Sequence, residues 1–209
     1  MKMTGKRIII ERVSICIICE GSEEYDYLSR LKELKVWNEQ YSVELIDAGG
    51  HGNLPARYQD KYQNGMFDLV LIFCDTDKKP YEQYMEIKEK IDRFHGVDGI
   101  SNKLVYFGNP CTMQIIIEHF ADIKLKTPAK KVNASVIQEY TGISDYKAKK
   151  EQRTALVIQI NKENYAQMVE RVSRLSSSDT DMNSSNFDIL MNHLSNDDIG
   201  WIDDINDQL

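Results

Sequence analysis

Cysteine, proline and long hydrophobic segments are all scarce in this chain of 209 residues. Four residues are cysteine and four are proline. No apolar run approaches the roughly 20 residues that a membrane-spanning helix needs. The charged, strand-like opening MKMTGKRIII lacks the pattern of a signal peptide. We therefore expect a cytoplasmic protein that does not cross a membrane.

The cysteines give little reason to expect a disulfide or a zinc site. Cys16, Cys19, Cys74 and Cys111 lie mostly inside apolar runs, where a free cysteine packs as a small hydrophobic residue. Cys16 and Cys19 form a CxxC pair, but their odd separation points the two side chains to opposite faces of a straight strand. Two thiolates on opposite faces cannot easily share one zinc ion.

Basic residues are also fewer than acidic ones, 26 against 33. The formal net charge is −7, which argues against a protein that coats nucleic acid non-specifically. It is compatible with local basic patches and with acidic sites that a metal ion neutralises. At 42% apolar residues the chain can bury a substantial core, and its length suits one domain with an appendage or two small domains.

The first part of the chain alternates between strand and helix patterns. Such alternation predicts an α/β domain over residues 1–122, with a mostly parallel, Rossmann-like sheet of four strands flanked by helices. We expect strands at 13–19, 41–46, 67–74 and 103–107, helices at 25–36, 54–63 and 81–94, and a further helix capped and opened by Asn109 and Pro110.

The second part, residues 123–209, is predicted to be a mainly helical extension. Helical spacing recurs at 164–175 and 187–194, and a short strand-like pattern appears at 155–160. The segment 124–153 holds eight basic and three acidic residues. The tail 179–209 holds eight aspartates and neither lysine nor arginine. Only the first of these two segments has the charge to meet phosphates.

Acidic residues follow two of the predicted buried strands. Glu20 and Gly21 come directly after the strand at 13–19, and Asp75 and Asp77 follow the strand at 67–74. Ligands bind at the carboxyl ends of strands in open parallel sheets. In extended backbone Asp75 and Asp77 face the same side, so both carboxylates can converge on one Mg²⁺ ion. The alternative is that the segment DTDKKP is an ordinary turn.

This order of motifs resembles the TOPRIM domain of topoisomerases, primases and nucleases. Within that group the chain is similar to the RloB-like proteins, which include the second component of AbiL-type phage abortive-infection systems. The resemblance covers residues 13 to 120. The residues that carry it are Cys19-Glu20-Gly21 with Glu24 and Tyr27, the loop Gly49-Gly50-His51-Gly52, Phe67-Asp68 before Asp75 and Asp77, Asn109-Pro110-Cys111, and His119-Phe120.

The resemblance implies metal-dependent chemistry on the phosphodiester bonds of nucleic acid. Asp75 and Asp77 would hold Mg²⁺ or Mn²⁺, and Glu20 would act as a general acid or base or as a further ligand. It also implies a possible ATPase partner. Topoisomerase activity is not expected, because no motif marks one of the eleven tyrosines as a nucleophile.

One position departs from the family pattern. After Asn-Pro-Cys the family usually has an aromatic residue and a glutamate, whereas this chain has Thr112 and Met113. Met113 begins the i, i+3, i+4, i+7 pattern of a buried helix stripe. Glu118 is a poor substitute, since five residues on a helix correspond to roughly 7.5 Å and roughly 140°. The site is then either weakened or completed by Glu24, Gln114 or Glu118.

Several other residues are candidates for contacts with phosphates. His51 could contact one from its glycine loop, or be a solvated turn residue. Lys78 and Lys79 could steer a phosphate or balance the nearby acids. In the basic segment Tyr140 and Tyr146 could stack on bases, or the segment could be a solvated helical face. Its candidate nucleic-acid contacts are Lys130, Lys131, Lys147, Lys149, Lys150 and Arg153.

These observations favour a Mg²⁺-dependent nuclease acting on DNA or RNA in phage defence. The alternative is a TOPRIM-fold subunit that binds nucleic acid or an ATPase partner without cleaving. A primase-like polymerase is a weaker third reading, supported only by the shared acids. The pattern does not predict the oligomeric state, the number of metal ions or the cleavage specificity.

Overall fold

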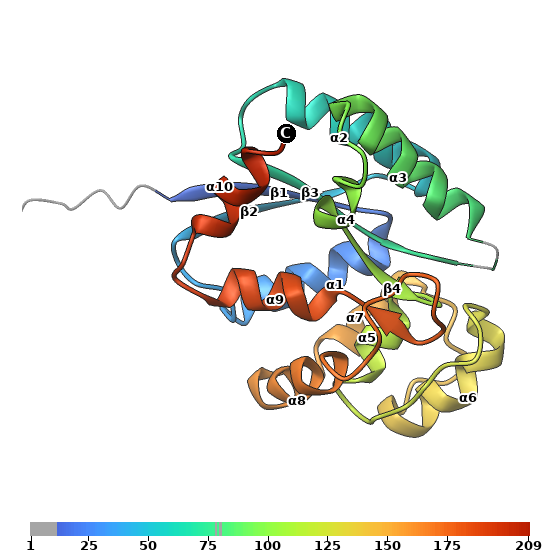
Figure 1. The fold of residues 1–209 in the computed structure, drawn as a ribbon. Helices are drawn as coiled ribbons and strands as arrows, with labels where there is room; N and C mark the ends of the chain where they lie inside the picture. Colours follow the sequence, from blue (N-terminus) through green and yellow to red (C-terminus); the bar gives the residue numbers. More distant parts are fainter. Residues whose placement is uncertain (1–11, 78, 80) are drawn as a thin grey trace, which may run out of the picture.

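The computed structural model describes residues 12–77, 79 and 81–209, which form an α/β fold (Figure 1). A sheet lies at its centre, with the strand order β2-β1-β3-β4-β5. The first four strands in this order form three parallel pairs, and β5 pairs antiparallel to β4. The strands are β1 (Val13–Cys19), β2 (Tyr41–Asp47), β3 (Leu69–Asp75), β4 (Val105–Asn109) and β5 (Ser184–Ser185).

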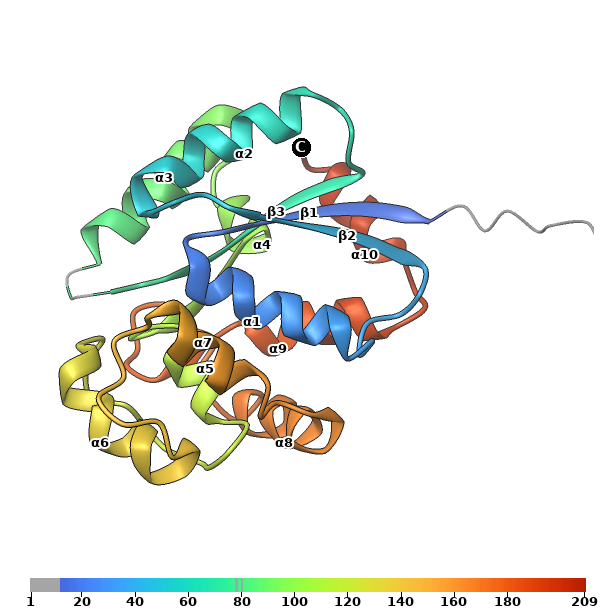
Figure 2. The ribbon, with the colours of Figure 1, turned by 180° about the vertical axis from the view of Figure 1, so that it is seen from behind.

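Helices cover both faces of the sheet, as Figures 1 and 2 show from opposite sides. One face carries α2 (Leu54–Gln63) and α3 (Glu82–His95), which lie side by side. The opposite face carries α1 (Ser22–Glu33) and α9 (Phe187–Ser195). The predicted helix-flanked, mostly parallel sheet is confirmed.

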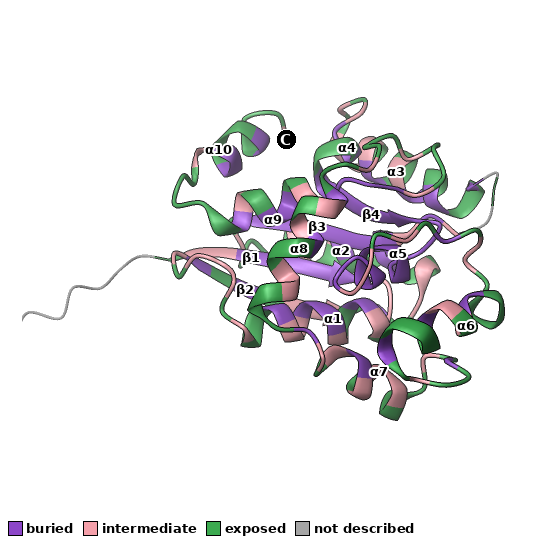
Figure 3. Cartoon of the chain, turned by 90° about the horizontal axis from the view of Figure 1, so that it is seen from below, coloured by how far each residue is buried: buried purple, intermediate pink, exposed green. Residues whose placement is uncertain are grey.

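The central strands are buried on both sides, as their nearly continuous apolar sequences predict (Figure 3). From Ile15 to Cys19 every residue of β1 is fully buried, and β3 is buried from Leu69 to Cys74. All four cysteines are buried free thiols. They pack as small hydrophobic residues, which confirms that expectation.

The sheet has five strands, whereas the sequence predicts four. The fifth, β5, comes from the polar segment near the C-terminal end and has only two residues, too few for a recognisable pattern. Side chains hold it beside β4: the Ser185 hydroxyl donates to the Phe107 carbonyl at 2.7 Å, and the Asn186 amide donates to the Val105 carbonyl at 3.0 Å. The edge of the sheet is therefore closed by residues from the C-terminal part.

The remaining elements are short helices. They are η1 (His51–Asn53), α4 (Ser101–Leu104), α5 (Met113–Ile117), α6 (Lys130–Thr141), α7 (Lys150–Val157), α8 (Lys162–Val172) and α10 (Gly200–Asn206). Among the described residues, no helix combines the length and the apolar character needed to cross a membrane.

Two local predictions are wrong. The strand-like pattern at 155–160 lies in and just after α7, because a short apolar run also fits a buried helix segment: Leu156 and Ile160 face the core. Asn109 does not cap a helix. It ends β4 before a cis peptide bond to Pro110, and α5 begins three residues later at Met113.

A buried histidine joins α1 to the helices of the C-terminal part. His119 Nε2 lies 2.9 Å from the Tyr27 hydroxyl, and His119 Nδ1 lies 3.2 Å from Asn164 Oδ1. Because an amide oxygen only accepts, Nδ1 carries the proton and Nε2 accepts the bond from Tyr27. Burial lowers the pKa of His119 to about 4, and the hydrogen bonds to Asn164 offset only part of this effect.

We expect this histidine to destabilise the fold in acid. Its pKa is 6.5 in the unfolded chain and about 4 in the folded one, so the unfolded chain binds an extra proton between these values. Stability present above pH 6.5 is lost as the pH falls towards 4, by about 3 kcal/mol. Urea titrations of the wild type and of His119→Gln at pH 7, 5.5 and 4 should show that the variant loses less free energy of unfolding. Equal losses would contradict this prediction.

Candidate metal centre

The candidate site lies at the carboxyl ends of β1 and β3, beside the loop that follows β2. The backbone N–H of Glu20 donates to the Phe73 carbonyl at 3.0 Å, so parallel pairing continues one residue beyond β1. The Glu20 carboxylate then accepts a hydrogen bond from the backbone N–H of Asp75 at 3.0 Å. Glu20 is thus fixed across the gap between the two strands.

Glycines bring His51 to the same place. Gly49 and Gly50 have φ angles of 72° and 125°, a backbone region that glycine adopts without steric cost. The backbone N–H of Gly50 donates to the Glu20 carbonyl at 2.8 Å, which ties the loop to the end of β1. His51 begins η1 directly after this contact. The loop therefore places the imidazole beside the Glu20 side chain.

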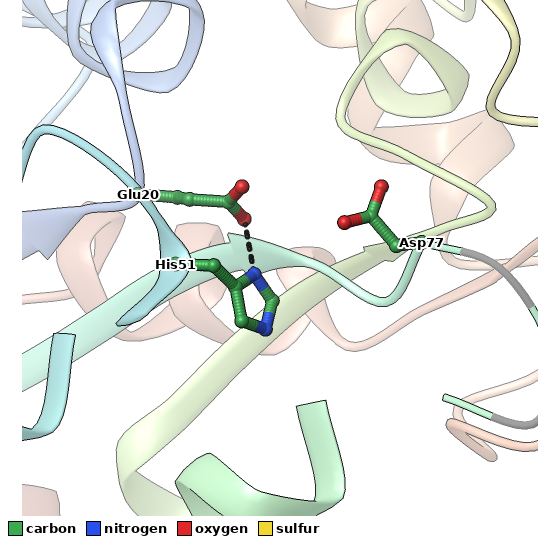
Figure 4. A group of neighbouring side chains, drawn as sticks. All are labelled: Glu20, His51 and Asp77. Atoms are coloured by element: carbon green, nitrogen blue, oxygen red, sulfur yellow. Dashed lines mark ion pairs between the residues drawn. The ribbon is translucent and has the colours of Figure 1, made fainter. Parts of the chain in front are cut away.

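Three side chains converge at this point: Glu20, His51 and Asp77 (Figure 4). Each offers one ligand atom, and these atoms all lie within 4.8 Å of one another. The Glu20 Oε2 atom lies 3.0 Å from His51 Nδ1. All three residues are half-buried.

The donor set fits a divalent metal ion. Both ring nitrogens of His51 are buried, and Nδ1 lies 3.0 Å from Glu20 Oε2. An imidazole beside two carboxylates is a donor set that binds divalent metal ions. Burial lowers the pKa of His51, but Glu20 and then Asp77 more than offset this, so the pKa lies above its ordinary value. A metal ion would have to displace a proton there.

Asp75 is not part of this group. The expectation that extended backbone carries both aspartates to one side is wrong, because β3 ends at Asp75 and Asp77 has a left-handed φ of 61°. The carboxylate of Asp75 instead accepts hydrogen bonds from the backbone N–H and the hydroxyl of Thr112, at 2.5 and 2.6 Å. The two aspartates therefore serve different neighbours.

Two further acids, Glu24 and Asp75, lie close enough to Glu20 for its charge to raise their pKa values. Glu24 Oε2 accepts from the backbone N–H of Gly21 at 3.0 Å. Burial, followed by the charges of Glu23 and Glu20, raises the pKa of Glu24 to about 8. Burial and the charge of Glu24 raise the pKa of Asp75 well above its ordinary value. Both carboxyls are held towards their protonated forms, and a nearby cation would lower both pKa values.

Residues of α5 do not reach the group. Met113 is buried in the core, as the helical spacing predicts. The Gln114 amide donates to Glu118 Oε1 at 2.8 Å and to the Ile123 carbonyl at 2.7 Å. Of the three residues expected to compensate for Met113, only Glu24 lies beside the acidic side chains. The Asn109 amide is also engaged elsewhere, with the Asp179 carbonyl at 3.0 Å.

The basic segment is partly used inside the protein. Lys130 Nζ lies 2.6 Å from a carboxylate oxygen of Glu23, and Arg153 Nε lies 2.7 Å from one of Asp26. Tyr146 is fully buried and donates to Glu23, so of the two alternatives for this segment, stacking on bases does not hold for Tyr146. The exposed candidates that remain are Lys131, Lys147, Lys149 and Lys150. Lys79 is exposed too, and Lys78 lies outside the described residues.

Sequence reasoning did not find Thr112. The residue marks a departure from the family motif, yet its backbone and side chain bind Asp75. A signal was present, since Thr112 stands where a helix should begin and threonine hydroxyls often bond there.

In comparisons with known proteins, no family model, no curated protein and no solved structure matches the chain.

We expect this group to bind Mn²⁺ more tightly than Mg²⁺. Carboxylates suit both ions, whereas an imidazole nitrogen suits transition metals better than Mg²⁺. Calorimetric titration at pH 7.5 should show at least about tenfold tighter binding of Mn²⁺. His51→Ala should remove most of the preference for Mn²⁺, and Asp77→Asn should weaken the binding of both ions.

Glu33 provides a matched control for these titrations, because it is an exposed acid at the far end of α1. Glu33→Gln should leave both affinities unchanged. An equal preference for Mn²⁺ in the wild type and in His51→Ala would remove the imidazole from the ligand set.

Proposed function

We propose that the protein is a metal-dependent nuclease that hydrolyses phosphodiester bonds of DNA or RNA. The observation that carries the proposal is the convergence of Glu20, His51 and Asp77 at the carboxyl ends of the parallel strands. A mixed set of carboxylates and imidazole suits Mn²⁺, and Mg²⁺ with lower affinity. A bound ion of this kind can generate a hydroxide nucleophile and neutralise charge on a scissile phosphate.

The surrounding residues have roles that their contacts support. Glu20 is oriented by the N–H of Asp75, so its carboxylate is held for binding rather than free to rotate. The Glu24 carboxyl, with a pKa of about 8, holds a proton at neutral pH. A metal ion bound nearby would lower this pKa and release the proton. Asp75 is a positioning residue, because Thr112 engages its carboxylate.

We further propose that the domain is TOPRIM-like and that the protein acts in phage defence, as its resemblance to RloB-like proteins suggests. The mostly parallel sheet with acids at its carboxyl edge supports this. A cytoplasmic setting and an ATPase partner are part of the same proposal.

A second candidate function is binding of nucleic acid or of the ATPase partner without cleavage. Met113 favours it, because the side chain is in the core and the neighbouring Gln114 and Glu118 bind each other. In this case the site would lack one acid that the family pattern contains.

Cleavage assays separate these functions. Wild-type protein would be incubated with single- and double-stranded DNA and RNA and with tRNA, in EDTA, Mg²⁺ or Mn²⁺. We expect cleavage only with metal. Glu20→Gln and Asp77→Asn should lower the rate at least about 100-fold, a loss of roughly 2.7 kcal/mol of transition-state stabilisation.

Glu33→Gln serves as the control and should cleave as the wild type does. If Glu20→Gln and the wild type behave alike on every substrate, the nuclease proposal fails. Metal-independent binding without any cleavage would instead favour the binding subunit.

A further inference from the structure

A groove that starts beside His51, one of the three residues of the metal centre, continues between α2 and α3. It consists of two adjoining hollows of about 150 and 390 Å³. The first includes His51 in its lining, and the second lies further along the two helices. Gly52, Pro55 and Lys90 line both hollows, so the two are continuous.

The groove follows from the residues of the two helices. The α2 side is formed by the small residues Gly52, Pro55 and Ala56, which leave room between the parallel helices. The α3 side carries Lys90 and Arg93, which are three residues apart and so share one helix face. Both of these side chains are exposed.

The charge of this lining suits phosphates. Lys90 and Arg93 are positive, and Glu86 is the acidic residue among those lining the two hollows. Lys90 and Glu86 form a pair at 2.7 Å, but both are well exposed, so the pair contributes little and can exchange for a phosphate. Among the described residues, Arg93 forms no ion pair.

The basic segment 124–153 is a poorer candidate for the same task. Lys130 and Arg153 already neutralise acids of α1. Helices α6 and α7 also lie on the opposite side of the sheet from α2 and α3 (Figures 1 and 2). A nucleic-acid strand bound across α6 and α7 would not follow the groove that leads to His51.

We propose that the groove between α2 and α3 carries the phosphate backbone of the nucleic-acid substrate towards the metal centre. This inference rests on the proposed nuclease function and names the surface that function uses. Lys90 and Arg93 contact successive phosphates, and Gln59, which also lines the groove, offers an amide donor. Contacts of this kind position the substrate without reading its sequence.

Two matched double variants test the proposal. Lys90→Gln with Arg93→Gln removes two charges from the groove. Lys147→Gln with Lys149→Gln removes two from the basic segment, where Lys147 is likewise paired with an acid, Asp145, at 2.5 Å. Binding of fluorescent DNA and RNA oligonucleotides, single- and double-stranded, would be measured by anisotropy in EDTA, which prevents metal-dependent cleavage.

The groove variant should bind about tenfold more weakly than the wild type at 100 mM salt. The dependence of log K on log salt should become shallower by roughly 1.4 for single strands and roughly 1.8 for duplexes. The control variant should stay within about twofold of the wild type. Thermal melting should show that both variants fold.

Unchanged binding by the groove variant, or an equal loss in the control, would overturn the proposal. So would a wild type that binds none of the oligonucleotides. The nuclease function is judged separately. If the wild type cleaves and Glu20→Gln does not, the nuclease proposal stands even where the proposal about the groove fails.

Discussion

The site depends on the parallel pairing of β1 with β3. This pairing aligns Cys19 with Phe73, so the residues that follow the two strands leave the sheet side by side. The Asp75 N–H can then bond to the Glu20 carboxylate, and the glycine loop after β2 is tied to the Glu20 carbonyl. Because each contact uses backbone atoms, the positions of the acids follow from the register of the sheet.

Concentrating acids at one edge has an electrostatic cost, and the structure limits it in two ways. Protonation limits the charge on Glu24 and Asp75, whose pKa values are raised by burial. Pairing neutralises Glu23, which binds Lys130 and the hydroxyl of Tyr146. Glu20 and Asp77 converge instead on the imidazole of His51, whose Nδ1 lies 3.0 Å from Glu20 Oε2. The electrostatics thus favour one cation at one place.

The sheet and the two strand ends that carry acids could be predicted from the sequence. The reason is that a strand buried on both faces of a sheet has a nearly continuous apolar sequence, which is easy to recognise. The sequence could not predict where each carboxylate points. That depends on the left-handed φ of Asp77 and on the hydroxyl of Thr112, which no spacing rule encodes. The position of His51 depends likewise on the positive φ angles of Gly49 and Gly50. At 155–160 a run of six residues fits both secondary structures, and tertiary packing decided for a helix.

The contact of β5 with β4 joins two distant parts of the chain at one edge of the sheet. The last strand of the sheet lies about eighty residues beyond its neighbour in sequence, and Ser185 and Asn186 bind the main chain of Val105 and Phe107. That edge of the sheet can close only after the helices between β4 and β5 in the sequence have been synthesised. During synthesis β4 would therefore expose unpaired backbone groups until β5 covers them, and an exposed strand edge of this kind can pair with other chains.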